Sequence, residues 1–321
     1  MRGRHEVSIV IPCYCSGSWM EELVSGIGAA MRCFENWELI LVNDDSPDNG
    51  VTWKAIRDAS NSNENIIGID LQANAGQFHA SICGMEQSTG SIVVLMDDDL
   101  QHDPKFIPIL IDALEEQEAD CVMGSFEKKR HSIIRNFGSW IIRQTFSRLH
   151  GLPKGVRMSS YRAIRRSAVD MMIQHHTANP VLGALVLGSS RKVINVNVPH
   201  SARPYGKSGY RFSRLVKATL DNVFLASTLP LRVFSYLGVV TFVASLAAAG
   251  YFAYQYFTEG PGAAPGFTTI VLLELFLIGI VSMGLGLIGE YLDRVIDEVE
   301  KKPRWHVRET VGIEDSSDDG Q

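Results

Sequence analysis

The sequence predicts an α/β domain with a parallel sheet, followed by a hairpin of two transmembrane helices. Three observations lead to this prediction. Short runs rich in β-branched residues alternate with segments of helical spacing over about the first 200 residues. Two long and nearly uncharged runs follow after about residue 230. Basic residues flank these runs on their outer sides and are absent from the segment that connects them.

Five runs have the composition of strands that are covered on both faces. The run SIVVLMD, for example, is apolar almost throughout, as expected of a buried parallel strand. Segments with helical spacing lie between most of these runs, and strands that alternate with helices form parallel sheets. The predicted strands are 7–11, 38–43, 66–71, 92–97 and 121–124, and the predicted helical segments are 20–34, 51–60, 76–87 and 105–117.

The two uncharged runs are the predicted membrane spans. Residues 233–257 contain no charged side chain, and residues 267–289 contain only Glu274. Each run exceeds the roughly 20 apolar residues that a spanning helix needs. The basic flanks predict that both sides of the hairpin face the cytoplasm; a buried hairpin of a soluble protein is the alternative. Glu274 and the small residues of the spans suit contacts within a homo-oligomer.

The remaining segments complete the predicted organisation. No signal peptide is recognisable at the N-terminus, so a multi-pass protein of the inner (cytoplasmic) membrane is expected, with the soluble domain and both termini in the cytoplasm. The formal net charge of −6 argues against a nucleic-acid partner. Basic and apolar residues interleave over 208–231, which suits an amphipathic helix among membrane lipids, or else an ordinary surface helix. The predicted parts are a soluble domain (1–207), this juxtamembrane segment (208–231), the two spans (232–290) and a tail (291–321) that is disordered from about residue 309.

Three consecutive aspartates follow the fourth predicted strand. Adjacent carboxylates repel one another unless a cation compensates their charge. In an extended chain Asp97 and Asp99 point to one side with Gln101, and Asp98 points to the other. Oxygen ligands suit Mg²⁺ or Mn²⁺, which bind one or two carboxylates together with substrate phosphates. A solvated acidic turn before a helix that begins near Pro104 is the alternative.

Polar segments follow two further strands at the same expected edge of the sheet. Asp44 suits hydrogen bonds to a base or ribose, although aspartate is equally common in plain turns. Asn74, Gly76 and Gln77 precede a helix, where glycine permits close approach of a ligand and the helix N-terminus attracts phosphate. A helix start without a ligand explains this segment as well.

A basic loop, RPYGKS, precedes the predicted membrane region. Arg203 and Lys207 in this loop suit contacts with phosphate groups. The spacing of the loop differs from that of a P-loop. A basic patch that touches only lipid headgroups is the alternative.

Taken in order, these motifs resemble the polyprenyl-phosphate glycosyltransferases of glycosyltransferase family 2. The matching segments are VSIVIPCY, VNDDSPDNG, NAGQFHASICGM, LMDDDLQHDP, RPYGKSGYRF, TLPLRVFSYLG and GLIGEYLDRV, within roughly residues 6–308.

The resemblance implies a GT-A fold, the Rossmann-like fold of nucleotide-diphospho-sugar transferases. It also implies inverting transfer from a nucleotide sugar, UDP-linked rather than GDP-linked, to polyprenyl phosphate of the undecaprenyl type, with Mg²⁺ or Mn²⁺. The product would be a lipid-linked monosaccharide for modification of the cell envelope, such as its lipopolysaccharide. The resemblance implies metal and diphosphate binding by Asp97, Asp99 and Gln101, nucleotide binding by Pro12 and Asp44, and phosphate contacts by Arg203 and Lys207. Together with the segments described above, the predicted donor-binding residues are Pro12, Tyr14, Asp44, Asn74, Gly76, Gln77, Asp97, Asp98 and Lys207, and the predicted catalytic residues are Asp99, Arg162 and Arg203.

The sequence departs from the family pattern at two places. Cys15 and Ser16 follow Tyr14 where the family has Asn-Glu, so one nucleotide contact is absent. Ser159 and Ser160 stand where many members carry an aspartate that is a proposed catalytic residue. A phosphate acceptor tolerates the second loss, because its second pKa of about 6 leaves it mostly a dianion that attacks without a general base.

Two other functions compete with a lipid-phosphate transferase. One is transfer to a hydroxyl acceptor or processive polysaccharide synthesis. A processive synthase is expected to carry Gln-x-x-Arg-Trp before its spans, whereas Arg304-Trp305 follows both of them here. The other is a catalytically silent membrane scaffold, against which the intact aspartate pattern argues.

Overall fold

The computed structural model describes residues 6–126, 152–153, 155–175, 181–199, 266–299 and 303–313, with scattered positions between 236 and 258. The chain divides into two compact units, one formed by residues 1–209 with 302–321 and the other by 210–301. Arg203, Lys207 and the predicted amphipathic segment 208–231 lie outside the described residues.

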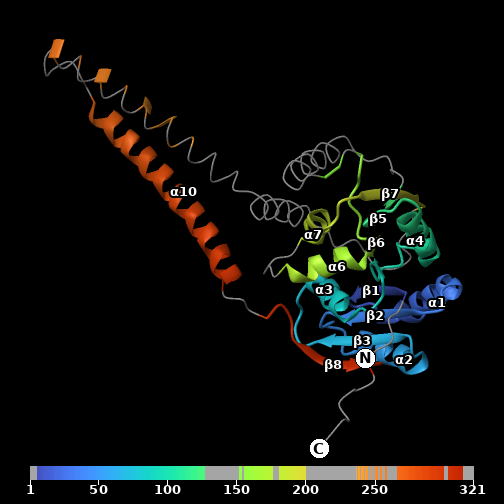
Figure 1. Ribbon diagram of the computed structural model, residues 1–321. Helices are drawn as coiled ribbons and strands as arrows, with labels where there is room; N and C mark the ends of the chain where they lie inside the picture. Colours follow the sequence, from blue (N-terminus) through green and yellow to red (C-terminus); the bar gives the residue numbers. More distant parts are fainter. Residues whose placement is uncertain are drawn as a thin grey trace, which may run out of the picture. The chain divides into compact units, whose positions relative to one another are not determined.

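Among the described residues, one eight-stranded sheet forms the centre of the first unit (Figure 1). Its strand order is β7-β5-β6-β4-β1-β2-β3-β8. The four strands β4, β1, β2 and β3 are parallel, and β5 and β7 are parallel to each other. The strands are β1 (Val7–Cys13), β2 (Trp37–Asn43), β3 (Ile66–Leu71), β4 (Ile92–Leu95), β5 (Cys121–Phe126), β6 (Arg162–Arg165), β7 (Val193–Val198) and β8 (Val307–Val311).

The five predicted strands are confirmed, but the sheet is mixed, so the prediction of a parallel sheet is wrong for β6 and β8. Strand β6 runs antiparallel to both β4 and β5, and β8 runs antiparallel to β3. Both strands are short and carry charged residues, so they lack the apolar signal of buried parallel strands. The predicted disorder from about residue 309 is likewise wrong for the part of the tail that forms β8.

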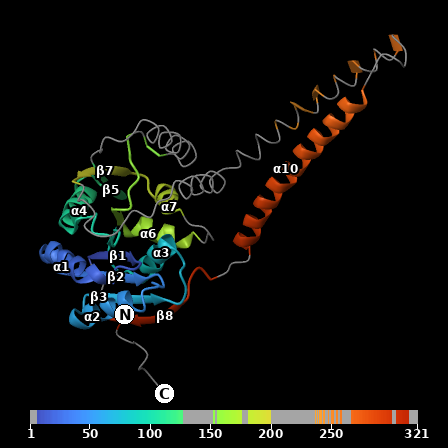
Figure 2. The ribbon, with the colours of Figure 1, turned by 180° about the vertical axis from the view of Figure 1, so that it is seen from behind.

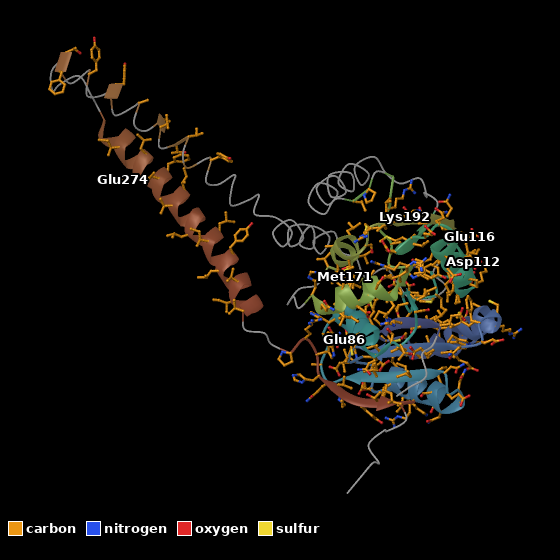
Figure 3. The ribbon with its side chains drawn as sticks, viewed as in Figure 1. Glu86, Asp112, Glu116, Met171, Lys192 and Glu274 are labelled. Carbon is orange, nitrogen blue, oxygen red and sulfur yellow. The ribbon has the colours of Figure 1, made fainter. Side chains whose placement is uncertain are left out.

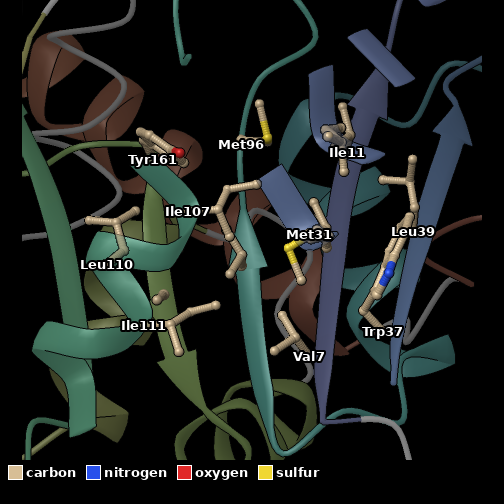
Figure 4. Packing of buried hydrophobic residues seen from close by; sticks show 14 of the residues in the cluster. Val7, Ile11, Met31, Trp37, Leu39, Met96, Ile107, Leu110, Ile111 and Tyr161 are labelled. Carbon is tan, nitrogen blue, oxygen red and sulfur yellow. The ribbon is translucent and has the colours of Figure 1, made fainter. Parts of the chain in front are cut away.

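Helices cover both faces of the sheet (Figures 1 and 2). Buried side chains of one face pack with α1, α2 and α4, and those of the other face pack with α3, α6 and α7. Figure 4 shows part of the first core, in which Met31 and Ile107 lie near strand residues such as Ile11. The helices are α1 (Met20–Ala30), α2 (Val51–Ser62), α3 (Gln77–Gln87), α4 (Ile107–Glu116), α6 (Arg166–Gln174) and α7 (Leu182–Ser189), with short 3₁₀ turns η1 (Gly17–Trp19), η2 (Met31–Cys33) and η3 (Pro104–Phe106).

Helix α4 illustrates how the sequence determines these layers. Ile107, Leu110, Ile111 and Leu114 recur at helical spacing, and all four are buried. Burial of each such side chain contributes about 1.5–3 kcal/mol. The η3 turn lies immediately before α4, and Asp103 caps it by accepting a hydrogen bond from the backbone N–H of Lys105.

The second unit contains α10 (Phe267–Val299). This helix begins at the first residue of the second predicted span. Among the residues that the structure describes, no helix combines the length and the apolar character needed to cross a membrane. The predicted pair of spans is therefore not confirmed, and most of residues 233–257 lie outside the described part of the chain.

Candidate functional site

The candidate site lies where the four central parallel strands end. The segments that follow β1, β2, β3 and β4 contain Tyr14, Asp44, Gly76 and Asp97, respectively. Parallel strands have their carboxyl ends at one edge of the sheet, so these distant segments become neighbours. Hydrogen bonds join the segments to one another, and the predicted convergence is therefore confirmed.

Asp97 connects three parts of this site. Its Oδ1 accepts a hydrogen bond from Gln77 Nε2 at 2.6 Å, and its Oδ2 accepts one from Ser160 Oγ at 2.6 Å. Its backbone N–H donates to Nδ1 of the buried His102 at 3.0 Å, and the His102 ring stacks on Tyr161. The carboxylate is thus held between the start of α3 and the segment that precedes β6.

Asp98 contacts a different segment from Asp97. Its Oδ2 accepts a hydrogen bond from the backbone N–H of Tyr14 at 2.9 Å, and its carbonyl accepts one from Trp19 Nε1 at 2.6 Å. Burial is the main cause that raises the pKa of Asp98 to about 6, and repulsion from Asp97 and Asp99 acts in the same direction. A bound cation is expected to lower this pKa because it stabilises the ionised carboxylate.

The chain turns immediately after the three aspartates. Asp99 Oδ1 accepts a hydrogen bond from the backbone N–H of Gln101 at 3.1 Å, and Leu100 has a left-handed φ of 58°. The prediction that Gln101 continues an extended chain on the side of Asp97 and Asp99 is therefore wrong. The physical reason is that β4 ends at Leu95, so its alternation does not extend through the turn.

Asp44 holds the loop between β3 and α3. Its Oδ1 accepts a hydrogen bond from the backbone N–H of Ala75 at 2.7 Å, and its Oδ2 accepts one from that of Gly76 at 2.9 Å. Asn74 Nδ2 donates to the Asp44 carbonyl at 3.0 Å. Gly76 has a φ of 91°, which residues with a Cβ rarely adopt. Burial raises the pKa of Asp44, and the two backbone hydrogen bonds oppose this shift.

Asp44→Ala is expected to lower the free energy of unfolding by about 1–3 kcal/mol, because two loop N–H groups lose a charged acceptor. Urea unfolding followed by circular dichroism measures this change. The control is Asp58→Ala on the exposed side of α2, which should stay within about 0.5 kcal/mol of the wild-type chain. Equal stability of the two variants would contradict the role of Asp44 in holding the loop.

Arg162 is a buried cation with unused donors. The residue is 5% exposed, and its Nε and Nη1 groups are buried without a hydrogen-bond partner among the residues that the structure describes. Arg162 lies on β6 opposite Leu95 of β4. Leu95 precedes Asp97 by two residues. Burial lowers the pKa of Arg162, and electrostatic interactions with Cys121 and Asp97 oppose this shift. Arg162 therefore places a buried positive charge at the same sheet edge as Asp97.

The segment before β6 contains serines where the family resemblance leads one to expect an aspartate. Ser160 Oγ donates to Asp97, and Ser159 Oγ accepts a hydrogen bond from the backbone N–H of Tyr161 at 3.2 Å. The segment therefore brings hydroxyl groups rather than a carboxylate next to Asp97.

The aspartates fit a divalent cation whose coordination a substrate completes. Among the described residues, no group of three or more His, Cys, Asp or Glu side chains is arranged to hold a metal ion. Mg²⁺ in phosphate-transfer sites, however, is bound through one or two carboxylates, with phosphate and water oxygens as further ligands. Asp97 and Asp99 fit a site of this kind. The Gln101 contact involves its backbone N–H, which is not a metal ligand.

Several other residues complete the comparison of prediction and structure. Pro12 lies within β1 opposite Val42, and Tyr14 is exposed. Gln77 is the first residue of α3. His102 was not among the predicted site residues, although it lies five residues after Asp97. The contacts of Ser160, Trp19 and Arg308 were not predicted either, because no local pattern indicates them.

Family models match two parts of the chain. The model described as glycosyl transferase family 2 matches residues 8–172, and the model described as GtrB C-terminal hairpin matches residues 229–295. Undecaprenyl-phosphate 4-deoxy-4-formamido-L-arabinose transferase of Proteus mirabilis is 32% identical over 312 residues, which are 96% of this chain and 95% of the relative. The protein of the same name from Pectobacterium carotovorum is 32% identical, over 95% of this chain and 93% of that relative.

Solved structures support the fold. Glucosyl-3-phosphoglycerate synthase from Mycobacterium tuberculosis, in complex with Mn²⁺ and uridine-diphosphate-glucose, has a TM-score of 0.50 and 16% identity, covering 68% of this chain and 77% of the other. A second complex of that synthase, with Mn²⁺, uridine diphosphate and phosphoglyceric acid, also has a TM-score of 0.50, at 18% identity, covering 68% of this chain and 76% of the other. The predicted GT-A architecture is thereby confirmed.

Proposed function

The chain belongs to glycosyl transferase family 2 and carries a GtrB-type C-terminal hairpin, and we propose that it transfers a sugar from a nucleoside diphosphate to the phosphate of undecaprenyl-type lipid, with inversion at the anomeric carbon. The observation that carries the proposal is the convergence of Asp44, Asp97 and the buried cation Arg162 at one edge of the sheet. The product is a lipid-linked monosaccharide for modification of cell-envelope glycans such as lipopolysaccharide. The named relatives, similar over almost their whole length, act on undecaprenyl phosphate by their names.

The donor occupies the edge formed by the segments after β1, β2 and β3. Asp44 and the loop it holds face the nucleoside, as the resemblance implies, and UDP is preferred to GDP. A structural neighbour binds uridine-diphosphate-glucose with Mn²⁺, which supports this preference. Asp97 and Asp99 would hold Mg²⁺ or Mn²⁺, which neutralises charge on the diphosphate when bound.

The acceptor phosphate binds beside Arg162. One of its oxygens attacks the anomeric carbon while the bond from that carbon to the diphosphate oxygen breaks. No proton has to leave the attacking oxygen, because a phosphate monoester is mostly a dianion at neutral pH. Ser160 in place of a carboxylate suits this chemistry, since a further negative charge would repel both phosphorylated substrates. The guanidinium of Arg162 reduces the same repulsion and orients the acceptor.

The same proposal includes location and assembly. A polyprenyl chain keeps the acceptor in a bilayer, so the enzyme works at the cytoplasmic face of the inner membrane, with both termini on that side. The hairpin matched at residues 229–295 and the basic flanks of the predicted spans support this location. Contacts near Glu274 suit a homo-oligomer.

A donor panel tests the function. The purified full chain, with Mn²⁺ and undecaprenyl phosphate in detergent, is given UDP-linked and GDP-linked sugars. Mass spectrometry is expected to detect a glycosylated lipid phosphate together with released nucleoside diphosphate. Undecaprenol, which has a hydroxyl in place of the phosphate, is the control acceptor and should give no product. Equal turnover of undecaprenol would contradict the assignment of the acceptor.

A further inference from the structure

The chain segment that follows α10 returns to the candidate site. Helix α10 ends at Val299, and residues 303–313 belong to the same compact unit as the sheet. Strand β8 in this segment extends the sheet at the edge of β3 (Figures 1 and 2). Trp305 packs near His79 of α3, and Arg304 contacts Glu86 on the same helix, which Figure 3 labels. The segment therefore borders the loops between the strand ends and α3.

Arg308 of β8 joins two of these loops. Its Nη1 donates to Asp70 Oδ2 at 2.9 Å, and its Nη2 donates to Asp45 Oδ1 at 3.2 Å and to the carbonyl of Gln72 at 2.9 Å. The side chain of Asp70 is only 2% exposed, so its charge needs a cation nearby. Arg308 supplies that cation and at the same time ties the neighbour of Asp44 to the end of β3.

A chain of hydrogen bonds continues from Asp70 across the sheet edge. Asn43 Nδ2 donates to Asp70 Oδ1 at 2.6 Å, and Ser46 Oγ donates to Asn43 Oδ1 at 2.6 Å. The backbone N–H of Cys15 donates in turn to Ser46 Oγ at 3.0 Å. These contacts connect Arg308 with the loop after β1, whose Tyr14 N–H contacts Asp98.

Two residues at the ends of this network have strained backbone. Cys15 has a φ of 56° and Asp45 a φ of 48°, values that non-glycine residues seldom adopt. Each is engaged by the network, Cys15 through its N–H and Asp45 through its carboxylate. Such conformations persist when surrounding contacts determine them. The network that engages both residues thus ends at Arg308.

We propose that Arg308 is a positioning residue for the donor: through Asp45 and Asp70 it keeps the loops after β1 and β2 in the arrangement that binds the nucleoside diphosphate. The inference rests on the proposed function, since it concerns the same donor site. A ligand that binds only one arrangement has an apparent Kd equal to its intrinsic Kd divided by the fraction of molecules in that arrangement. Fewer molecules in the binding arrangement therefore mean a higher apparent Kd.

Nucleotide binding to the full chain tests this role without any acceptor. Titration calorimetry with UDP and Mn²⁺ is expected to show a Kd at least tenfold higher for Arg308→Met, with Arg308→Lys in between, because lysine reaches one carboxylate instead of two. The matched control is Arg57→Met. In the described part of the chain Arg57 binds Glu309 of the same strand and neither of the two loops, so the Kd of this variant should stay within twofold of the wild-type value.

The outcomes separate the two proposals. A wild-type chain that binds neither UDP nor GDP with Mn²⁺ would overturn the proposed function. If the wild-type chain binds, two results would overturn the inference alone. One is a Kd of Arg308→Met within twofold of the wild-type Kd, and the other is an equal rise in Kd for Arg57→Met. Hydrogen exchange is a second measurement if the Met variant is unstable: Arg308→Lys should exchange faster over 13–16 and 43–46 than Arg57→Lys, and equal rates would also overturn the inference.

Discussion

Asp97→Asn is expected to lower kcat at least about 100-fold while the chain stays folded, which is the scale seen when a preorganised electrostatic contact at a reacting centre is lost. The carboxylate accepts hydrogen bonds from Gln77 and Ser160 on separate oxygens, and an amide offers only one acceptor oxygen. The substitution also removes a charge that would hold the cation on the donor diphosphate. Turnover of the donor sugar at saturating Mn²⁺ and lipid phosphate measures the effect.

The control for Asp97 is Asp112→Asn. Asp112 is exposed on α4, a helix whose outer side faces solvent (Figure 3). The same change of charge and shape there should leave kcat within about twofold of the wild-type value, because exposed charges are well screened. If Asp97→Asn retains more than a third of the wild-type kcat at saturating metal, the electrostatic role of Asp97 is wrong.

Arg162→Met is expected to stabilise the chain and inactivate it. Two of its buried N–H groups have no partner among the described residues, which together costs about 1–3 kcal/mol after the attraction to Asp97 is set against it, and methionine fills a similar volume without polar atoms. The free energy of unfolding should therefore rise by about 1–3 kcal/mol, which raises Tm by a few degrees. The kcat for undecaprenyl phosphate should fall at least about 100-fold, since the acceptor loses its buried cation. Thermal unfolding and steady-state kinetics measure the two effects.

Arg165→Met on the same strand is the matched control. The Arg165 guanidinium donates to the carbonyls of Ala119 at 2.8 Å and Leu114 at 3.0 Å, so its donors are satisfied. Its replacement should lower stability by about 1–3 kcal/mol and leave kcat nearly unchanged. A destabilised Arg162→Met with normal turnover would show that Arg162 serves only the fold.

Much of the fold was predictable because it rests on local patterns. Strands β1 to β5 are apolar runs, and a run such as Ile92–Leu95 identifies itself by composition. Strand β6 contains only Arg162–Arg165, a sequence without the composition of a strand. Its extended conformation comes from pairing with β4 on one side and β5 on the other. Strand β8 contains two charged residues, Arg308 and Glu309. Arg308 binds Asp70 and Glu309 binds Trp53, and the sequence alone does not indicate these contacts.

By itself the sequence determined the order of strands and helices in the centre of the domain, and hence that Asp44 and Asp97 meet at one edge. This followed because the carboxyl ends of parallel strands share an edge whatever their loops contain. Only the tertiary structure decided the turn at Leu100, the unpartnered donors of Arg162, and the return of β8 to the sheet. Arg308 and Asp70 are 238 residues apart, and their contact arises from a strand pairing that no local pattern encodes.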